Sequence, residues 1–108
     1  PTLATDWQKV TSTYYADMDT IKFDGDDAKI WVKFDGSKTE KYSSLPNVHW
    51  VYRLEAFNRN TNQHLTLNEI VYDNDMQIIE NILNPYGSFE QTFSTESDLN
   101  KIKNVIFK

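Results

Sequence analysis

The side chains best suited to catalysis are two histidines. His49 opens a predicted strand, and His64 follows an asparagine-rich turn, where we expect a solvent-exposed histidine. A serine triad needs an activated serine, a base and an orienting acid. The sequence contains no Gly-x-Ser-x-Gly motif that would present such a serine. Neither histidine therefore indicates hydrolytic chemistry.

Aspartates two residues apart occur in three places, and such pairs serve general acid–base catalysis or Ca²⁺ binding in other proteins. The pairs are Asp17 and Asp19, Asp24 and Asp26, and Asp73 and Asp75. Asp-Gly and Asp-Asn-Asp sequences favour turns, because their side chains bond nearby backbone amides. The run 24–27 also lacks the spacing and distal glutamate of an EF-hand loop. The pairs therefore predict turns, and the sequence predicts no metal site and no catalytic residue.

The charge and the cysteine count exclude further classes of function. The 108 residues carry 16 acidic and 11 basic side chains, a net charge of −5, whereas nucleic-acid binders need an excess of Lys and Arg. The interleaved charges are Lys29, Lys33, Lys38 and Lys41 with Asp24, Asp26, Asp27 and Asp35. Cysteine is absent, which excludes disulfides, zinc thiolates and cysteine catalysis. With three scattered glycines there is no phosphate-binding loop either, so no cofactor and no nucleic acid are predicted.

One strand combines aromatic and cationic side chains. Ile30, Val32 and Phe34 alternate onto one face, which places Trp31 on the other face between two lysines. Trp31 either packs under a helix or loop, with lysine stems over it, or anchors a protein partner. The candidate partner-binding patch consists of Lys29, Trp31, Lys33, Arg53 and Arg59.

Short segments of alternating apolar and polar residues, separated by Asp, Asn, Gly and Ser, predict strands. The predicted strands are 7–12 and 14–17, broken near Thr13, then 20–23, 28–34, 49–58, 65–72 and 76–83. The alternation slips between Leu67 and Ile70, which indicates a β-bulge. Residues 37–47 are expected to form a loop or a weak edge, and the segment 84–88 to end the last strand.

The end of the chain changes to helical spacing. Leu99, Ile102 and Ile106 lie on one helical face, and Thr95 is the predicted N-cap with Asp98 three residues later. A sheet of this size needs its apolar face covered. The sequence therefore predicts an α+β fold, in which an antiparallel sheet of about six strands carries one C-terminal α-helix packed on it. Residues 1–108 form one domain.

Several of these segments together resemble the bacterial surface-adhesin protein E family. The matching segments, in order, are Trp7-Gln8-Lys9-Val10, Tyr15-Ala16-Asp17, Asp19-Thr20-Ile21, residues 28–33, residues 71–75 and residues 84–90. The resemblance covers nearly the whole chain and implies an antiparallel sheet with a C-terminal helix. It also implies an envelope lipoprotein or secreted domain, adhesive toward host matrix proteins in some members. The chain departs from the family near residues 57–58 and 105–106, where members often carry cysteines.

The leading hypothesis is a noncatalytic exported domain, in the cell envelope or extracellular, that binds a protein partner such as a host matrix protein. One alternative is a periplasmic or secreted inhibitor or structural module, in which the sheet face or a loop, with 37–47 as the candidate, blocks an enzyme. The other is a small ligand-binding or hydrolytic domain with aspartates beside His49 or His64. No apolar run approaches the length of a membrane span, and we expect an export signal to have preceded Pro1. A homodimer through an exposed edge strand is a further expectation.

Overall fold

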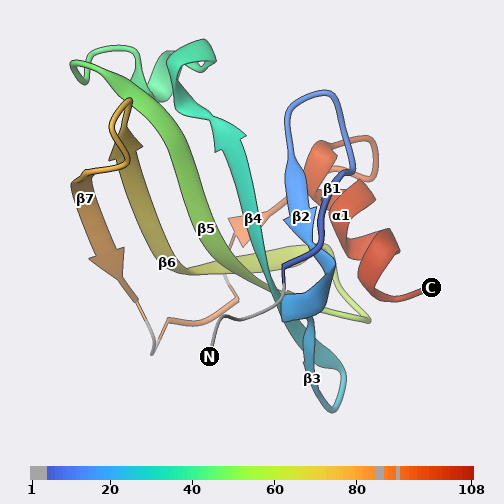
Figure 1. Ribbon diagram of the computed structural model, residues 1–108. Coiled ribbons are helices and arrows are strands. Elements are labelled where there is room, and N and C mark those ends of the chain that lie inside the picture. Colours follow the sequence, from blue (N-terminus) through green and yellow to red (C-terminus); the bar gives the residue numbers. More distant parts are fainter. Residues whose placement is uncertain (1–4, 85–86, 90) are drawn as a thin grey trace.

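The computed structural model describes residues 5–84, 87–89 and 91–108, without the side chain of Gln91. These described residues form eight strands in one antiparallel sheet and one α-helix (Figure 1). The strands are β1 (Trp7–Lys9), β2 (Tyr15–Asp17), β3 (Lys22–Asp24), β4 (Asp27–Asp35), β5 (Val48–Asn58), β6 (Gln63–Asp73), β7 (Ile78–Leu83) and β8 (Gln91–Thr92), and the helix is α1 (Asp98–Ile106). The predicted α+β class, with an antiparallel sheet and a C-terminal helix, is confirmed.

The main path of the sheet has six strands in the order β1-β2-β4-β5-β6-β7, while β3 pairs with β4 and β8 with β6. The longest pairing joins β4 to β5, from Asp27 opposite Asn58 to Asp35 opposite Trp50. A tight turn at Gly25, with φ +60, closes the β3–β4 hairpin as the sequence predicts. Because side chains alternate along each strand, the pairing of these long strands determines which side chains lie on the same face of the sheet.

The predicted bulge lies at Leu67. Leu54 of β5 faces Asn68 and Glu55 faces Thr66, so Leu67 is the extra residue on β6. The break predicted near Thr13 is also present, because the Thr11 hydroxyl accepts hydrogen bonds from the amides of Thr13 and Tyr14. The local sequence thus predicted both irregularities correctly.

Helix α1 packs on one face of the sheet, which we name the inner face (Figure 1). Buried Ile102 and Ile106 contact Ile30, Val32 and Phe57 from β4 and β5. This confirms the apolar stripe predicted for the helix. The helix is too short to span a membrane, as is every other helix among the described residues.

The predicted N-cap of α1 is wrong by two residues. Ser97 caps the helix, and its Oγ accepts a hydrogen bond from the amide of Asn100 at 3.3 Å. The carbonyl of Thr95 instead accepts from the side chain of Asn100. Ser97 is the N-cap because the helix begins at the next residue, Asp98. The negative charge of Asp98 is also favourable at the positive end of the helix dipole.

The segment 37–47, predicted to be a loop or a weak edge, folds onto the inner face. Two 3₁₀ helices, η2 (Gly36–Lys38) and η3 (Glu40–Tyr42), form its first half and the residue before it. Tyr42 is only 3% exposed and packs with Phe34, Val48, Val51 and Val71. Burial of this ring fixes the segment over the part of the core that these four residues form.

Strand boundaries differ from prediction at the ends. The strand predicted from residue 76 begins at Ile78, because Met76 lies in a turn with φ +59. Thr20 belongs to a third 3₁₀ helix, η1 (Met18–Thr20), so the next strand starts at Lys22. Of the segment 84–88 that was predicted to end the last strand, residues 85 and 86 lie outside the described residues.

Strand β7 ends the main path of the sheet. Four of the five large apolar side chains that are strongly exposed in the described residues lie on it or in its turn. They are Met76, Ile78, Ile82 and Leu83. The homodimer expected from the sequence stays a prediction, for which β7 supplies an edge.

Candidate functional site

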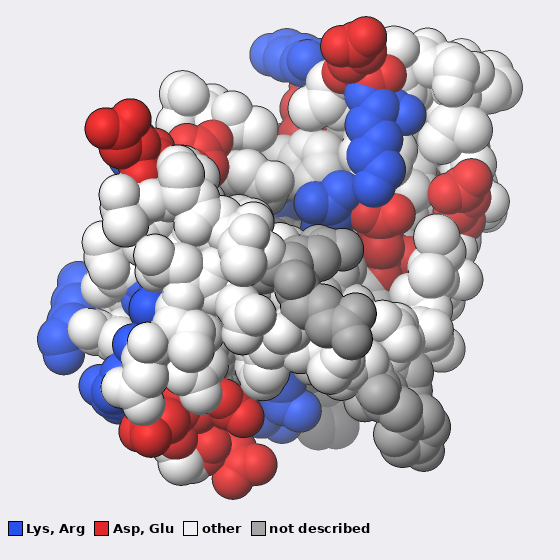
Figure 2. Space-filling model, turned by 180° about the vertical axis from the view of Figure 1, so that it is seen from behind, with Lys and Arg blue, Asp and Glu red and all other residues white. Residues whose placement is uncertain are grey.

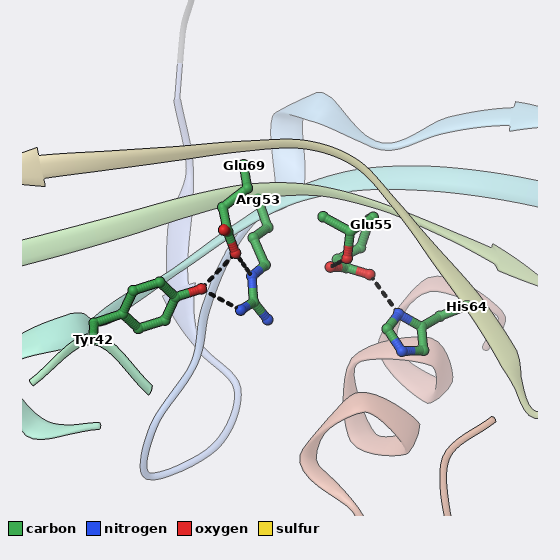
Figure 3. Close-up of polar contacts among 6 residues, drawn as sticks. Tyr42, Arg53, Glu55, His64 and Glu69 are labelled. Carbon is green, nitrogen blue, oxygen red and sulfur yellow. Dashed lines mark hydrogen bonds and ion pairs between the residues drawn. The ribbon is translucent and has the colours of Figure 1, made fainter. Parts of the chain in front are cut away.

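A buried ion pair joins the middle strands on the inner face. Arg53 of β5 faces Glu69 of β6, and the Arg53 Nε donates to Glu69 Oε1 at 2.6 Å (Figure 3). The Tyr42 hydroxyl donates to the same oxygen at 2.5 Å and accepts from Arg53 Nη2 at 2.5 Å. Three residues from η3, β5 and β6 therefore form one closed hydrogen-bonded cluster.

The cluster shifts the titration of all three groups. Burial, reinforced by the hydrogen bond to Glu69, raises the pKa of Tyr42 to about 12. Burial opposes ionisation of Glu69, but the hydrogen bonds from Tyr42 and Arg53 outweigh it and lower the pKa of this carboxyl. Burial likewise opposes the charge of Arg53, yet Tyr42 and Glu69 raise its pKa overall. Arg53 and Glu69 therefore stay charged at neutral pH.

A second polar cluster surrounds Glu55, which is completely buried. Its Oε2 lies 2.8 Å from Nδ1 of His64 (Figure 3). Its Oε1 accepts a hydrogen bond from the Thr66 hydroxyl. In a serine-type triad the histidine stands between the acid and the hydroxyl. Here the acid stands in the middle, so His64 does not activate Thr66.

His64 is not solvated as predicted, because only 8% of it is exposed. It faces Phe57 across the β5–β6 pair, which directs its ring to the inner face. The ring centroids of Phe57 and Phe93 lie 6.4 Å and 5.9 Å from that of His64. The turn before His64 is polar, but strand alternation decides its burial. His49, the other histidine, stacks on Trp50 with 5.1 Å between ring centroids.

A pocket of about 230 Å³ opens beside the two clusters. Its walls include Lys41, Arg53, His64, Glu69, Ile82 and Asn84. The pocket thus collects charged, polar and apolar groups from η3 and three adjacent strands. Pockets with a few convergent polar groups are the usual places for small ligands.

The opposite, outer face carries a cluster of aromatic rings around Lys33, which we name the aromatic face. The Lys33 ammonium lies 4.5 Å from the ring centroid of Trp7, 4.9 Å from Trp50, 5.7 Å from Tyr52 and 5.9 Å from Tyr15. Burial lowers the pKa of Lys33. The rings provide cation–π attraction that offsets part of this desolvation. Four strands thus meet around one ammonium.

The structure brings together three of the five residues of the predicted patch. Lys29, Trp31 and Lys33 alternate with buried residues along β4 and share the outer face. Trp31 is half-buried, and its amide donates to the Thr20 hydroxyl at 3.1 Å. It does not lie under α1, which packs on the other face, so the helix part of that interpretation is wrong and packing under a loop stays a prediction.

The two arginines of the predicted patch lie elsewhere. Arg53 faces Val32, a buried inner-face residue, and joins the cluster with Glu69. Arg59 lies beyond β5, 4.7 Å above the ring of Phe107 and 3.7 Å from a carboxylate oxygen of Asp26. The predicted five-residue patch therefore does not form, because the β4–β5 register, unknown from the sequence, decides the face of Arg53.

Residues outside the predicted partner-binding patch dominate both sites. Glu55, Glu69 and Tyr42 build the inner clusters, and Trp7 and Tyr15 complete the aromatic face. One usable signal was the alternation of β5, which puts Arg and Glu on one face and aromatic residues on the other. A strand face with two ionisable residues among apolar ones indicates buried polar pairs.

Two of the three aspartate pairs bond nearby backbone amides, as predicted, whereas the Asp26 carboxylate contacts the side chains of Asn60 and Arg59. Asp73 Oδ1 accepts hydrogen bonds from the amides of Asp75 at 2.8 Å and Gln77 at 2.9 Å. Asp17 Oδ1 accepts from the amides of Asp6 at 2.9 Å and Asp19 at 3.1 Å. Among the described residues there is no group of three or more His, Cys, Asp or Glu side chains that could hold a metal ion.

The surface charge is distributed in small groups. On the face shown in Figure 2, basic and acidic side chains lie beside one another in small groups among uncharged residues. This fits the interleaved lysines and aspartates of the sequence, and gives that face no continuous basic stripe.

Comparison of the chain with family models, curated proteins and solved structures returns no match.

Proposed function

We propose that this chain is a noncatalytic exported domain, in the cell envelope or secreted, that binds a protein partner through the aromatic face. The observation that carries the proposal is the gathering of Trp7, Tyr15, Trp50 and Tyr52 around Lys33, on the face opposite α1. Each of these side chains is only partly buried within the chain. Trp and Tyr are enriched among the residues that anchor protein interfaces.

The neighbours of the rings extend the proposed surface. Tyr72 lies 5.1 Å from Tyr52, ring centroid to centroid, and half-buried Trp31 and Leu54 face one another on β4 and β5. Exposed Lys29 borders this apolar area. An apolar centre with a charged border is the usual anatomy of a protein interface.

The exported location and the adhesive role follow from the resemblance to the surface-adhesin protein E family. The segments that carry it include Trp7 and residues 15–17 and 28–33, which supply β1, β2 and β4 of the proposed surface. A host matrix protein is therefore the partner class to test first.

The inhibitor alternative has less support. In its loop form it needs a segment that enters an active site, and the candidate segment 37–47 is anchored through buried Tyr42. The Tyr42 ring and its hydrogen bond to Glu69 fix this segment to the core, while most of its other residues are exposed.

The proposal is tested by capture of purified extracellular-matrix proteins on immobilised chain. Trp31→Ala removes an outer-face ring, and the matched control Ile82→Ala truncates an exposed apolar side chain at the inner-face pocket. We expect saturable capture of at least one matrix protein, weakened about tenfold or more by Trp31→Ala and unchanged by Ile82→Ala. Absence of capture, or equal weakening by both variants, contradicts the proposal.

A further inference from the structure

We propose that the inner-face pocket binds a short hydroxycarboxylate, a small anion with one carboxylate and one hydroxyl. The site is separate from the aromatic face, since Arg53, His64 and Glu69 project from β5 and β6 on the opposite side of the sheet. It therefore goes beyond the proposed partner binding and does not depend on it.

Free cationic donors select the carboxylate. Lys41 and Arg53 line the pocket with one carboxylate, Glu69, which already accepts hydrogen bonds from Arg53 and Tyr42. A second carboxylate, buried Glu55, lies behind the pocket and is held by His64 and Thr66. Arg53 uses Nε and Nη2 within its cluster, and its Nη1 has no hydrogen-bond partner among the described residues. Lys41 is exposed, and the described residues offer its ammonium no ion pair. Two cationic donors are thus available to a bound carboxylate.

His64 selects the hydroxyl. Its Nδ1 faces the Glu55 carboxylate at 2.8 Å, and a carboxylate accepts hydrogen bonds, so in neutral His64 the proton belongs on Nδ1. Nε2 is then an acceptor, and among the described residues it has no partner. A ligand hydroxyl donates to such a nitrogen, whereas a bare carboxylate is repelled by its lone pair. Figure 3 shows that the Arg53 and His64 side chains project from the same face of the sheet.

The volume of the pocket and its apolar wall at Ile82 indicate the size and character of the ligand's carbon skeleton. The pocket of about 230 Å³ is smaller than the roughly 300–1,000 Å³ of sites for drug-sized ligands, so it suits a molecule of few heavy atoms. Ile82 contributes an apolar side chain that is 54% exposed. A short alkyl group would cover this side chain, which inorganic phosphate cannot do.

The test is an NMR titration of the full chain at neutral pH that follows the His64 ring and the Arg53 side chain. The probes are lactate, propionate as its analogue without the hydroxyl, and inorganic phosphate, each against sodium chloride at equal ionic strength. We expect saturable shifts at both residues with lactate and weaker binding of propionate. Equal binding of lactate and propionate, saturation with phosphate alone, or no shift beyond that of chloride overturns the proposal.

A matched pair of charge variants places the ligand. Lys41→Met removes the ammonium at the pocket, and Lys38→Met removes the same charge from an exposed position outside it. We expect Lys41→Met to weaken lactate binding about threefold to fivefold, as for loss of one exposed ionic contact, and Lys38→Met to leave it unchanged. Equal weakening by both variants indicates a general charge effect and overturns the proposal. Trp31→Ala leaves the titration unaltered, which separates this site from partner binding.

Discussion

Tyr42 and Glu69, 27 positions apart in the chain, share a buried hydrogen bond of 2.5 Å between the phenol and the carboxylate. This bond fastens the segment of η3 to the middle of the sheet, because Glu69 also pairs with Arg53 across β5 and β6. A carboxylate that holds both a strand partner and a loop residue couples the placement of the loop to the sheet.

Removal of the phenol hydroxyl tests this coupling. We expect Tyr42→Phe to lower the free energy of unfolding by about 1–2 kcal/mol, because Glu69 and Arg53 each lose one buried hydrogen bond. Urea denaturation measures the change. Tyr52→Phe is the matched control, since the Tyr52 hydroxyl makes no hydrogen bond to the described residues. This variant should change the free energy of unfolding by less than about 0.5 kcal/mol. Equal losses in both variants would show that the Tyr42 bond adds nothing specific.

The same cluster predicts how stability depends on pH in acid. The ordinary pKa of a glutamate is 4.5, and that of Glu69 is lowered in the folded chain. Its stabilising contribution is therefore fully present above pH 4.5 and is lost as the pH falls through the lowered pKa. Urea denaturation between pH 2 and pH 7 should show a steeper loss in the parent than in Glu69→Gln. Parallel pH profiles for the two proteins would contradict the lowered pKa.

The aromatic face predicts that Trp7 holds the first strand in place. The Trp7 ring packs edge-on against the Tyr52 ring, with 5.6 Å between the ring centroids, and lies against the Lys33 ammonium. We expect Trp7→Ala to destabilise the chain by about 2–4 kcal/mol and to speed amide exchange in β1 and β2. Trp31→Ala removes an equal ring from the same face and should leave exchange in β1 unchanged. Faster exchange in β1 for both variants would indicate general destabilisation instead.

The start of α1 offers a direct test of the observed cap against the predicted one. We expect Ser97→Ala to lower the free energy of unfolding by about 1 kcal/mol, because the amide of Asn100 loses its partner. Thr95→Ala should have little effect, since the Thr95 backbone carbonyl, which accepts from Asn100, is retained. Thermal unfolding of the two variants measures the difference. A larger effect of Thr95→Ala would restore the N-cap predicted from sequence.

The sequence predicted those features that depend on residues close together in the chain. Alternation along 28–34 placed Ile30 and Val32 on the buried face, and the spacing of Ile102 and Ile106 predicted the helix stripe correctly. The sites depend on register between strands, which a single sequence does not encode locally. Arg53 was therefore grouped with Trp31, although the β4–β5 register puts Arg53 opposite Val32 and on the other face.

The exposed edge at β7 has a consequence for the behaviour of the chain in concentrated solution. Glu80 is the one charged residue in Ile78–Leu83, and it is exposed. Isolated charges on apolar edge strands act as gatekeepers, because an incoming strand would have to desolvate them. Along Ile78–Leu83 the protection against pairing with a second copy therefore depends on a single carboxylate.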